Sequence, residues 1–316
     1  MAGKKIIAVT GATGAQGGSL VRAILADKSG AFAVRAVTRD TNSEKARALA
    51  KAGAEVVAAN LDDSGSLVRA FEGAYGAFCV TAFWEHFSAD KEFQQAGNMA
   101  KAAKQTGLKH VIWSTLEDTR KLVPLSDKRM PTLQGKFKVP HFDMKGEADN
   151  LFREMGVPTT FLLASFYWEN FVYFGAGPKP GADGKLALTM PMGRAKLAGI
   201  GSEDIGKCAY EIFKKGGELI GKSIGIASDQ LTVTQIAAAM TKALGRDVVY
   251  NEVTPDVYRS FGFPGADDLG NMFQYYRDFE TEVCGVRSVA RTRELNPALQ
   301  SFDQWLAAKK QLIPLE

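Results

Sequence analysis

The chain has 316 residues, 46% of them hydrophobic and 23% charged, so it is long enough to bury a large core and to hold one large and one smaller domain. The net charge of +4 is mild and the basic pairs are scattered, which argues against direct nucleic-acid binding. Its three cysteines, Cys79, Cys208 and Cys284, indicate neither a disulfide framework nor a zinc site. No stretch approaches the roughly 20 apolar residues that a membrane span needs. We expect a cytoplasmic protein without a metal site or a membrane anchor.

Strand-like and helix-like patterns alternate from the N-terminus, which predicts an α/β fold with a Rossmann-type, doubly wound parallel sheet covered by helices. Strands are expected at residues 5–10, 33–38, 55–59, 76–81, 110–114 and 159–163. Helices are expected at residues 18–27, 43–52, 64–71, 89–106 and 142–155. Residues 117–140 contain three prolines and no clear period, so we expect a long loop over the carboxyl end of the sheet, where loops cover ligands.

The pattern becomes less regular after Phe166. We therefore expect a cofactor-binding Rossmann domain over residues 1–166 and a smaller α+β domain over residues 167–316. Some segments of the second domain should pack back onto the Rossmann sheet. Further strands are expected at residues 186–190, 223–227 and 248–253, and further helices at 203–214 and 234–244.

The first strand is followed by a glycine-rich run, Gly11-Ala12-Thr13-Gly14-Ala15-Gln16-Gly17, which leads into the first helix. Glycines at such a turn let the backbone approach a pyrophosphate, and the helix that follows points its positive end at the phosphates. The run therefore predicts a dinucleotide site. The Gly-x-x-Gly-x-x-Gly spacing is typical of extended and atypical short-chain dehydrogenases.

Charged and polar residues follow the next strands where an adenosine would lie. Arg39 closes the second strand, and an arginine there pairs with a 2′-phosphate, which favours NADP(H) over NAD(H). Asp40 complicates this interpretation because an acid at this place hydrogen-bonds a 2′-hydroxyl. Asp62, after the third strand, is placed for the adenine amino group, and Thr81, at the end of the fourth, should lie along the cofactor.

Several segments together resemble the NmrA-like family of atypical short-chain dehydrogenases, and within it the NADPH-sensing members. They are Gly11 to Gly18, Val37-Thr-Arg39, Val80-Thr-Ala-Phe-Trp84-Glu85, His141-Phe-Asp-Met-Lys145-Gly-Glu147, Tyr167-Trp-Glu169-Asn170 and Gly262-Phe-Pro-Gly-Ala266. The resemblance implies that the NADP contacts fall on Gly11 to Gln16, Arg39, Asp62, Thr81, Ala82, Phe83, Lys145, Phe166, Tyr167, Trp168 and Glu169. Basic residues of the sensor are replaced by Asn42, Ser43 and Gln94, so NAD(H) should be discriminated less sharply.

The candidates for catalysis are Lys145, His141 and Ser114. An ordinary short-chain dehydrogenase has a tyrosine four residues before a lysine that holds the ribose and lowers the phenol pKa. This chain keeps Lys145 but has His141 at the tyrosine position. Ser114 ends the fifth strand, where its hydroxyl is equally suited to satisfying nearby backbone. Tyr210 and Lys214 have the tyrosine-lysine spacing on a later helix, and we assign Tyr210 to packing.

The resemblance implies a redox sensor that binds NADP(H) and regulates protein partners, with little or no dehydrogenase turnover. The alternative is an NAD(P)H-dependent reductase of isoflavone-reductase or quinone-reductase type that uses Lys145. A homodimer is left open, and no direct contact with nucleic acid is expected. Aromatic residues after the strand ends, Phe83, Trp84, Phe87, Phe166, Tyr167 and Trp168, belong to either a pocket or the core.

Overall fold

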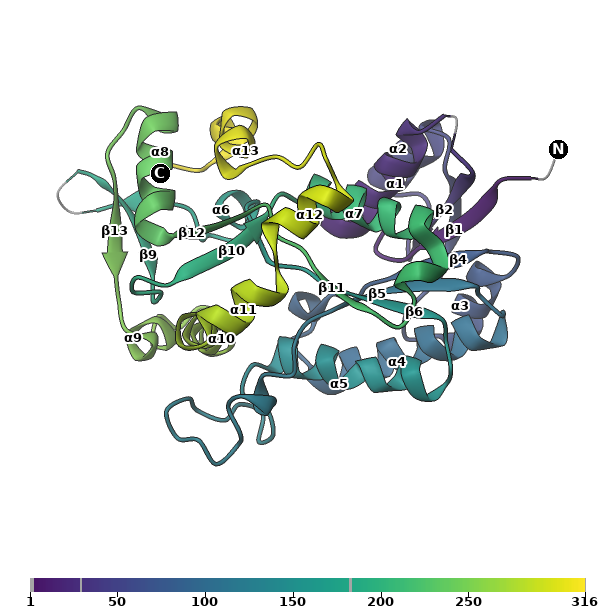
Figure 1. Cartoon of the computed structure of the whole chain (residues 1–316), viewed down its shortest axis with the longest axis horizontal. Helices are drawn as coiled ribbons and strands as arrows, with labels where there is room; N and C mark the ends of the chain where they lie inside the picture. Colours follow the sequence, from purple (N-terminus) through teal and green to yellow (C-terminus); the bar gives the residue numbers. More distant parts are fainter. Residues whose placement is uncertain (1–2, 29, 182–183, 316) are drawn as a thin grey trace. The chain divides into compact units, whose positions relative to one another are not determined.

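The computed structural model describes residues 3–28, 30–181 and 184–315 (Figure 1). Its contacts divide the chain into two units that are interleaved in the sequence. The first comprises Met1–Asp118, His141–Leu163 and Glu203–Ile224, and the second comprises Thr119–Pro140, Ala164–Ser202 and Gly225–Glu316. The expected domain boundary at residue 166 stays a prediction.

A seven-stranded sheet with the order β11-β6-β5-β4-β1-β2-β3 forms the centre of the first unit. Six of its strands pair in parallel, and β11 joins at the edge beside β6. The strands are β1 (Lys5–Val9), β2 (Phe32–Thr38), β3 (Glu55–Ala58), β4 (Gly76–Cys79), β5 (His110–Thr115), β6 (Thr159–Leu163) and β11 (Ser223–Gly225). The predicted Rossmann-type α/β fold is confirmed, and the six predicted strands end within two residues of the observed ones.

Helices cover both faces of this sheet (Figure 1). They are α1 (Ala15–Ala26), α2 (Glu44–Lys51), α3 (Ser64–Phe71), α4 (Ala89–Gln105), α5 (Pro140–Glu154) and α7 (Ser202–Lys215), with the short turns η1 (Phe83–Glu85) and η3 (Gly216–Leu219). Strands β4, β5 and β6 are buried at every position, as expected for strands with helices on both faces. Helices α1, α2 and α7 lie on one face, and α3, α4 and α5 lie on the other.

Helix α7 belongs to the first unit, although the sequence placed it in the second part. A Cβ atom on Gly206 of α7 would lie 2.3 Å from the backbone of Ser19 in α1, so only glycine allows the two helices to pack this closely. This helix carries Tyr210, whose hydroxyl donates to Asp27 Oδ2 at 2.8 Å beside Phe32, the first residue of β2. Tyr210 therefore lies at the amino end of β2, whereas Arg39 follows its carboxyl end.

The second unit has α+β composition, with two three-stranded sheets of order β12-β10-β7 and β13-β9-β8. Their strands are β7 (Phe166–Tyr167), β8 (Lys179–Pro180), β9 (Leu186–Met190), β10 (Lys196–Ile200), β12 (Asp229–Thr232) and β13 (Val248–Glu252). The helices are α6 (Asn170–Tyr173), α8 (Val233–Leu244), α9 (Pro255–Arg259), α10 (Ala266–Asp278), α11 (Glu280–Val286), α12 (Val289–Leu295) and α13 (Phe302–Lys309), with η2 (Thr119–Lys121) and η4 (Lys310–Leu312).

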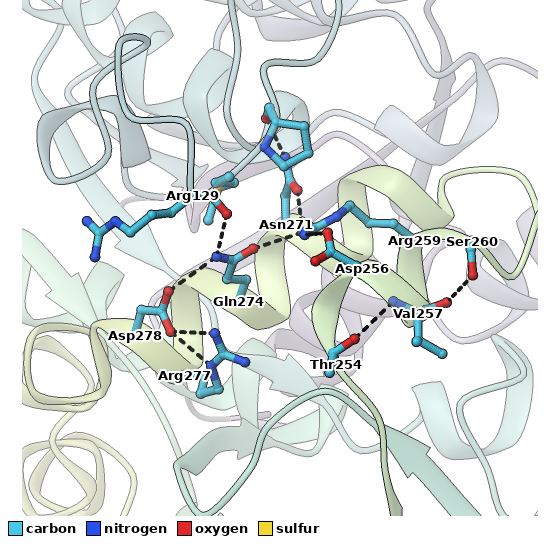
Figure 2. A network of polar contacts seen from close by, with 12 residues as sticks. Arg129, Thr254, Asp256, Val257, Arg259, Ser260, Asn271, Gln274, Arg277 and Asp278 are labelled. Carbon is cyan, nitrogen blue, oxygen red and sulfur yellow. Dashed lines mark hydrogen bonds and ion pairs between the residues drawn. The ribbon is translucent and has the colours of Figure 1, made fainter.

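The prolines of residues 119–140 do interrupt regular structure, since this segment contains only η2, one isolated bridge between Leu133 and Phe137, and the first residue of α5. Helix α10 holds the segment by side-chain amides (Figure 2). Asn271 Nδ2 donates to the carbonyl of Pro131 at 2.9 Å, and Gln274 Nε2 donates to the carbonyl of Arg129 at 2.9 Å. The expected place of this loop over the sheet of the first unit stays a prediction.

Within the described ranges, no helix is both long and apolar enough to cross a membrane.

Candidate functional site

The glycine-rich run forms a tight turn between β1 and α1. Gly11 has a φ of 59°, in the left-handed region that favours glycine, and its carbonyl accepts a hydrogen bond from the Gly14 amide at 2.9 Å. Gly14 then caps α1 in an extended conformation without a side-chain hydrogen bond. The turn delivers the chain directly from the carboxyl end of a central strand into the first turn of a twelve-residue helix.

Gly17 is required by the fold itself, whereas Gly14 is not. A Cβ atom at Gly17 would lie 2.4 Å from the Gly11 carbonyl oxygen and 2.6 Å from that of Thr10, so any side chain would push the helix off the turn. A Cβ atom at Gly14 would lie 3.3 Å from the Gly11 oxygen, a contact that a small shift relieves. Packing therefore explains Gly17, and the exposed Gly14 is left as the glycine best explained by a ligand.

The amino end of α1 is suited to an anion. Its first turn carries no acidic side chain, and no side chain caps its amide groups. Backbone amides at a helix N-terminus, together with the helix dipole, stabilise negative charge. Gln16, in this first turn, accepts a hydrogen bond from the buried hydroxyl of Ser114 at 2.8 Å. That contact gives the serine candidate a role in holding the turn against β5.

Arg39 meets a partner that the sequence did not predict. Its Nη1 lies 2.9 Å from Glu85 Oε2 and its Nη2 lies 3.0 Å from Glu85 Oε1. Asp40, the rival residue of the sequence analysis, instead accepts a hydrogen bond from the Asn42 amide at 2.8 Å through Oδ1. The arginine therefore keeps its place at the strand end, while its two terminal nitrogens contact a carboxylate.

Asp62 follows β3 and is held from helix α4. Gln95 Nε2 donates to Asp62 Oδ1 at 2.8 Å, and Lys91 Nζ lies 3.2 Å from Asp62 Oδ2. The Gln95 hydrogen bond, with a further contribution from Lys91, lowers the pKa of Asp62 below its ordinary value. The residue is thus fixed as an acceptor, which is the form that an adenine amino group would need.

Lys145 of α5 is neutralised by a buried carboxylate, Glu92 of α4. Lys145 Nζ lies 2.8 Å from Glu92 Oε1 and 2.5 Å from Thr81 Oγ1, and the same Glu92 oxygen accepts a hydrogen bond from Thr81. Glu92 is completely buried, and its Oε2 has no hydrogen-bond partner among the residues that the structure describes. Lys145 Nζ also lies 5.2 Å from the centroid of the Trp113 ring. These contacts assemble Thr81, Glu92, Trp113 and Lys145 from four different elements.

The helix that carries Lys145 is fixed to the end of β5. Thr115 Oγ1 donates to the Lys145 carbonyl at 3.1 Å and to Asp149 Oδ1 at 2.7 Å. At Gly146, a Cβ atom would lie 2.4 Å from the Asp118 amide nitrogen, so glycine allows α5 to approach the chain after β5. The backbone around Lys145 is thereby held without using its ammonium group.

His141, one turn before Lys145, lies among aromatic rings. The centroid of its imidazole is 4.9 Å from that of Trp84, 5.7 Å from that of Phe83 and 4.7 Å from that of Phe142. Its residue surface is 5% exposed. Phe87 completes the aromatic group with 41% exposure and a φ of 55°, and Ala82 before it is exposed. In the first unit, Phe83 and Trp84 therefore surround the tyrosine-replacing histidine.

The remaining cofactor candidates, Phe166, Tyr167, Trp168 and Glu169, lie in the second unit, where three of them have contacts of their own. Phe166 packs on Phe171 with ring centroids 5.4 Å apart. Trp168 is fully buried and donates from Nε1 to Ser228 at 3.1 Å. Glu169 accepts hydrogen bonds from the Ser202 amide at 2.9 Å and from Trp305 Nε1 at 3.0 Å. Their role toward a cofactor stays a prediction.

The chain matches the model of the NmrA-like family over residues 3–306. An NmrA-like family domain-containing oxidoreductase of Cladobotryum sp is 29% identical to it, with 85% of this chain and 83% of the relative covered. An NmrA-like family domain-containing protein of Dictyostelium discoideum is also 29% identical, with 96% and 97% covered.

Among solved structures, the chain resembles NmrA, a negative transcriptional regulator determined in complex with NAD and with NADP. The NAD complex has a TM-score of 0.79 at 25% identity, with 97% of this chain and 95% of that one covered. The NADP complex has a TM-score of 0.78 at the same identity. The family match spans most of the chain, and the chain belongs to the NmrA-like family.

Proposed function

We propose that this chain is a redox sensor that binds NADP(H), acts on protein partners and has little or no dehydrogenase turnover. One observation carries the proposal. Lys145 is held by a fully buried carboxylate while the position of the dehydrogenase tyrosine is a histidine buried among aromatic rings. The cofactor-binding parts are present without a group suited to proton exchange with a substrate.

The residues of the first unit fit a dinucleotide. The turn from Gly11 to Gly17 offers backbone amides and a helix N-terminus for the pyrophosphate, and Gly14 leaves room for its approach. Arg39 would pair with a 2′-phosphate, Asp62 would accept from the adenine, and Thr81 to Phe83 would line the cofactor. NmrA, the similar solved protein, has been crystallised with both NAD and NADP. We extend that binding to this chain with NADP(H) preferred because of Arg39.

Lys145 serves in this proposal as a positioning charge. In an ordinary short-chain dehydrogenase the lysine holds the ribose and lowers the pKa of a phenol. This chain has no phenol one turn before Lys145, and Glu92 already supplies the counter-charge. Two of the lysine's three N–H donors point at Glu92 and Thr81, which leaves one for a ribose hydroxyl.

A sensor must convert cofactor binding into a change that a partner can read. A ligand shifts a protein between conformations only as far as its affinity differs between them. Residues 83–88 are a suitable reporting segment, since they hold the Arg39 partner Glu85 and the exposed Phe87 with its left-handed backbone. We propose that NADP(H) alters this segment and that a regulatory protein recognises the result.

The sensor is tested by calorimetry followed by hydrogen exchange. Wild-type protein should bind NADPH, and exchange at residues 83–88 should differ between the free and the NADPH-bound protein. Failure to bind NADPH or NADP⁺ would overturn the cofactor assignment. Binding that leaves exchange at residues 83–88 unchanged would overturn the reporting role of this segment.

A reductase is the second candidate, because curated relatives of this chain are named oxidoreductases. The bound cofactor would supply a hydride, and the chain would have to supply a proton. Lys145 is the residue for that task, provided that it loses its proton to a substrate oxygen and regains one through Thr81 or Glu92. The two functions differ in whether NADPH is consumed.

A further inference from the structure

Arg39 and Glu85 form a two-pronged ion pair in the first unit. The arginine follows β2 and the glutamate ends η1, after β4, and both terminal nitrogens of the guanidinium lie within 3.0 Å of a carboxylate oxygen. The side chains are 68% and 52% exposed, so water and solutes reach them. The nitrogens that would grip a phosphate are thus covered by an acidic side chain that a ligand can displace.

We propose that Glu85 is a specificity-determining residue that competes with the 2′-phosphate of NADP(H) for Arg39. This inference rests on the proposed cofactor function. A phosphate and a carboxylate seek the same planar face of an arginine, since both accept two parallel N–H bonds. A phosphate that binds Arg39 must displace Glu85 or lie beside its negative charge, and NAD(H) meets neither obstacle.

The exposure of the pair limits the size of this effect. Exposed ion pairs contribute little to stability because water screens them and two long side chains must be ordered. Glu85 therefore weakens the preference for NADP(H) without abolishing it. The chain also lacks basic residues at Asn42 and Ser43, immediately after Arg39, that would offset the glutamate.

The matched control is a second arginine–glutamate pair on the same strand. Arg35 Nε lies 2.9 Å from Glu55 Oε2, and this glutamate is 49% exposed, close to the value for Glu85. Arg35 precedes the carboxyl end of β2 by three residues, and Glu55 is the first residue of β3. Glu55→Gln therefore removes the same charge from the same kind of pair away from the Arg39 end.

Calorimetric titration with NADPH and NADH tests the proposal on wild type, Glu85→Gln and Glu55→Gln. Glu85→Gln should tighten NADPH binding by about threefold to fivefold and leave NADH binding unchanged. Glu55→Gln should change neither. In an Arg39→Met background, Glu85→Gln should no longer favour NADPH.

The failures are distinguishable. A wild type that binds no nicotinamide cofactor would overturn the proposed function. A wild type that binds NADPH, with a Glu85→Gln variant that shifts NADPH and NADH affinities equally or not at all, would overturn only the role of Glu85. The same holds if the NADPH gain persists without Arg39.

Discussion

The glycine turn and the Lys145 region, both in the first unit, are built in different ways. The turn consists of backbone from one continuous segment, Gly11 to Gly17. The Lys145 region consists of side chains from four places in the sequence, namely Thr81, Glu92, Trp113 and Lys145. Backbone geometry tolerates sequence change around it, whereas proton transfer depends on a single side chain. A protein of this fold can therefore keep its cofactor site while losing its reaction.

The largest effect is expected from Gly14→Val, which should abolish NADPH binding and leave the protein folded. The branched side chain would fill the approach to the pyrophosphate, while its Cβ meets only one contact at 3.3 Å. Calorimetry and circular dichroism give the two readouts.

Gly17→Ala is the control for that variant. Its Cβ would lie 2.4 Å from the Gly11 oxygen, and overpacking of this kind costs about 1–3 kcal/mol of stability. If Gly14→Val destabilised the protein as much as Gly17→Ala, the distinction between a ligand glycine and a packing glycine would be wrong.

Glu92→Gln should have the next largest effect, on stability. It leaves the Lys145 ammonium buried without its counter-charge, and breaking a buried pair in this way costs about 3–5 kcal/mol. The free energy of unfolding in urea measures the loss. A second change, Lys145→Met, should restore most of it because it removes the orphaned charge.

A Glu92→Gln variant within about 0.5 kcal/mol of wild type would show that the ion pair contributes nothing in solution. Lys145 would then be free to act as the reductase alternative requires.

Arg39→Glu sharpens the comparison at the adenosine end. NADPH binding should weaken by one to two decades, since a charge-assisted hydrogen bond contributes about 1.5–3 kcal/mol. NADH binding should change far less because it has no 2′-phosphate. Calorimetric titration of both cofactors measures the ratio, and equal losses would remove Arg39 from phosphate recognition.

Tyr210→Phe should have the smallest effect. It removes the hydrogen bond to Asp27, at a cost of about 0.5–1.5 kcal/mol of stability, and should leave NADPH affinity unchanged. Burial and the Asp27 carboxylate raise the pKa of Tyr210, which also makes it a poor proton donor to a substrate. A loss of cofactor affinity or of activity at unchanged stability would contradict its assignment to packing.

The elements of the Rossmann sheet were predictable because hydrophobic pattern is local. The six strands and the glycine turn were read from runs of ten residues or fewer. Strands β10 and β12 escaped, since β10 contains a glycine, Gly199, pressed against the ring of Trp168, and β12 is only half buried. Both are defined by partners that are distant in sequence.

The ion pairs of the site were not predictable for the same reason. Arg39 and Glu85 are 46 residues apart, and Lys145 and Glu92 come from different helices. A signal for Glu92 did exist, because it lies one turn from Ala96 and two turns from Met99 on the buried stripe of α4. A charge on such a stripe indicates a buried partner.

The consumption of NADPH by purified protein tests the central claim most directly. Absorbance of bound NADPH would be followed after addition of quinones, enones and aldehydes, with wild type and Lys145→Met side by side. The account predicts that wild type binds NADPH and does not consume it at enzymatic rates, and that Lys145→Met only raises the dissociation constant. A wild type that reduces one of these compounds at about 1 per second or faster, and loses this on Lys145→Met, would contradict the account in favour of a reductase.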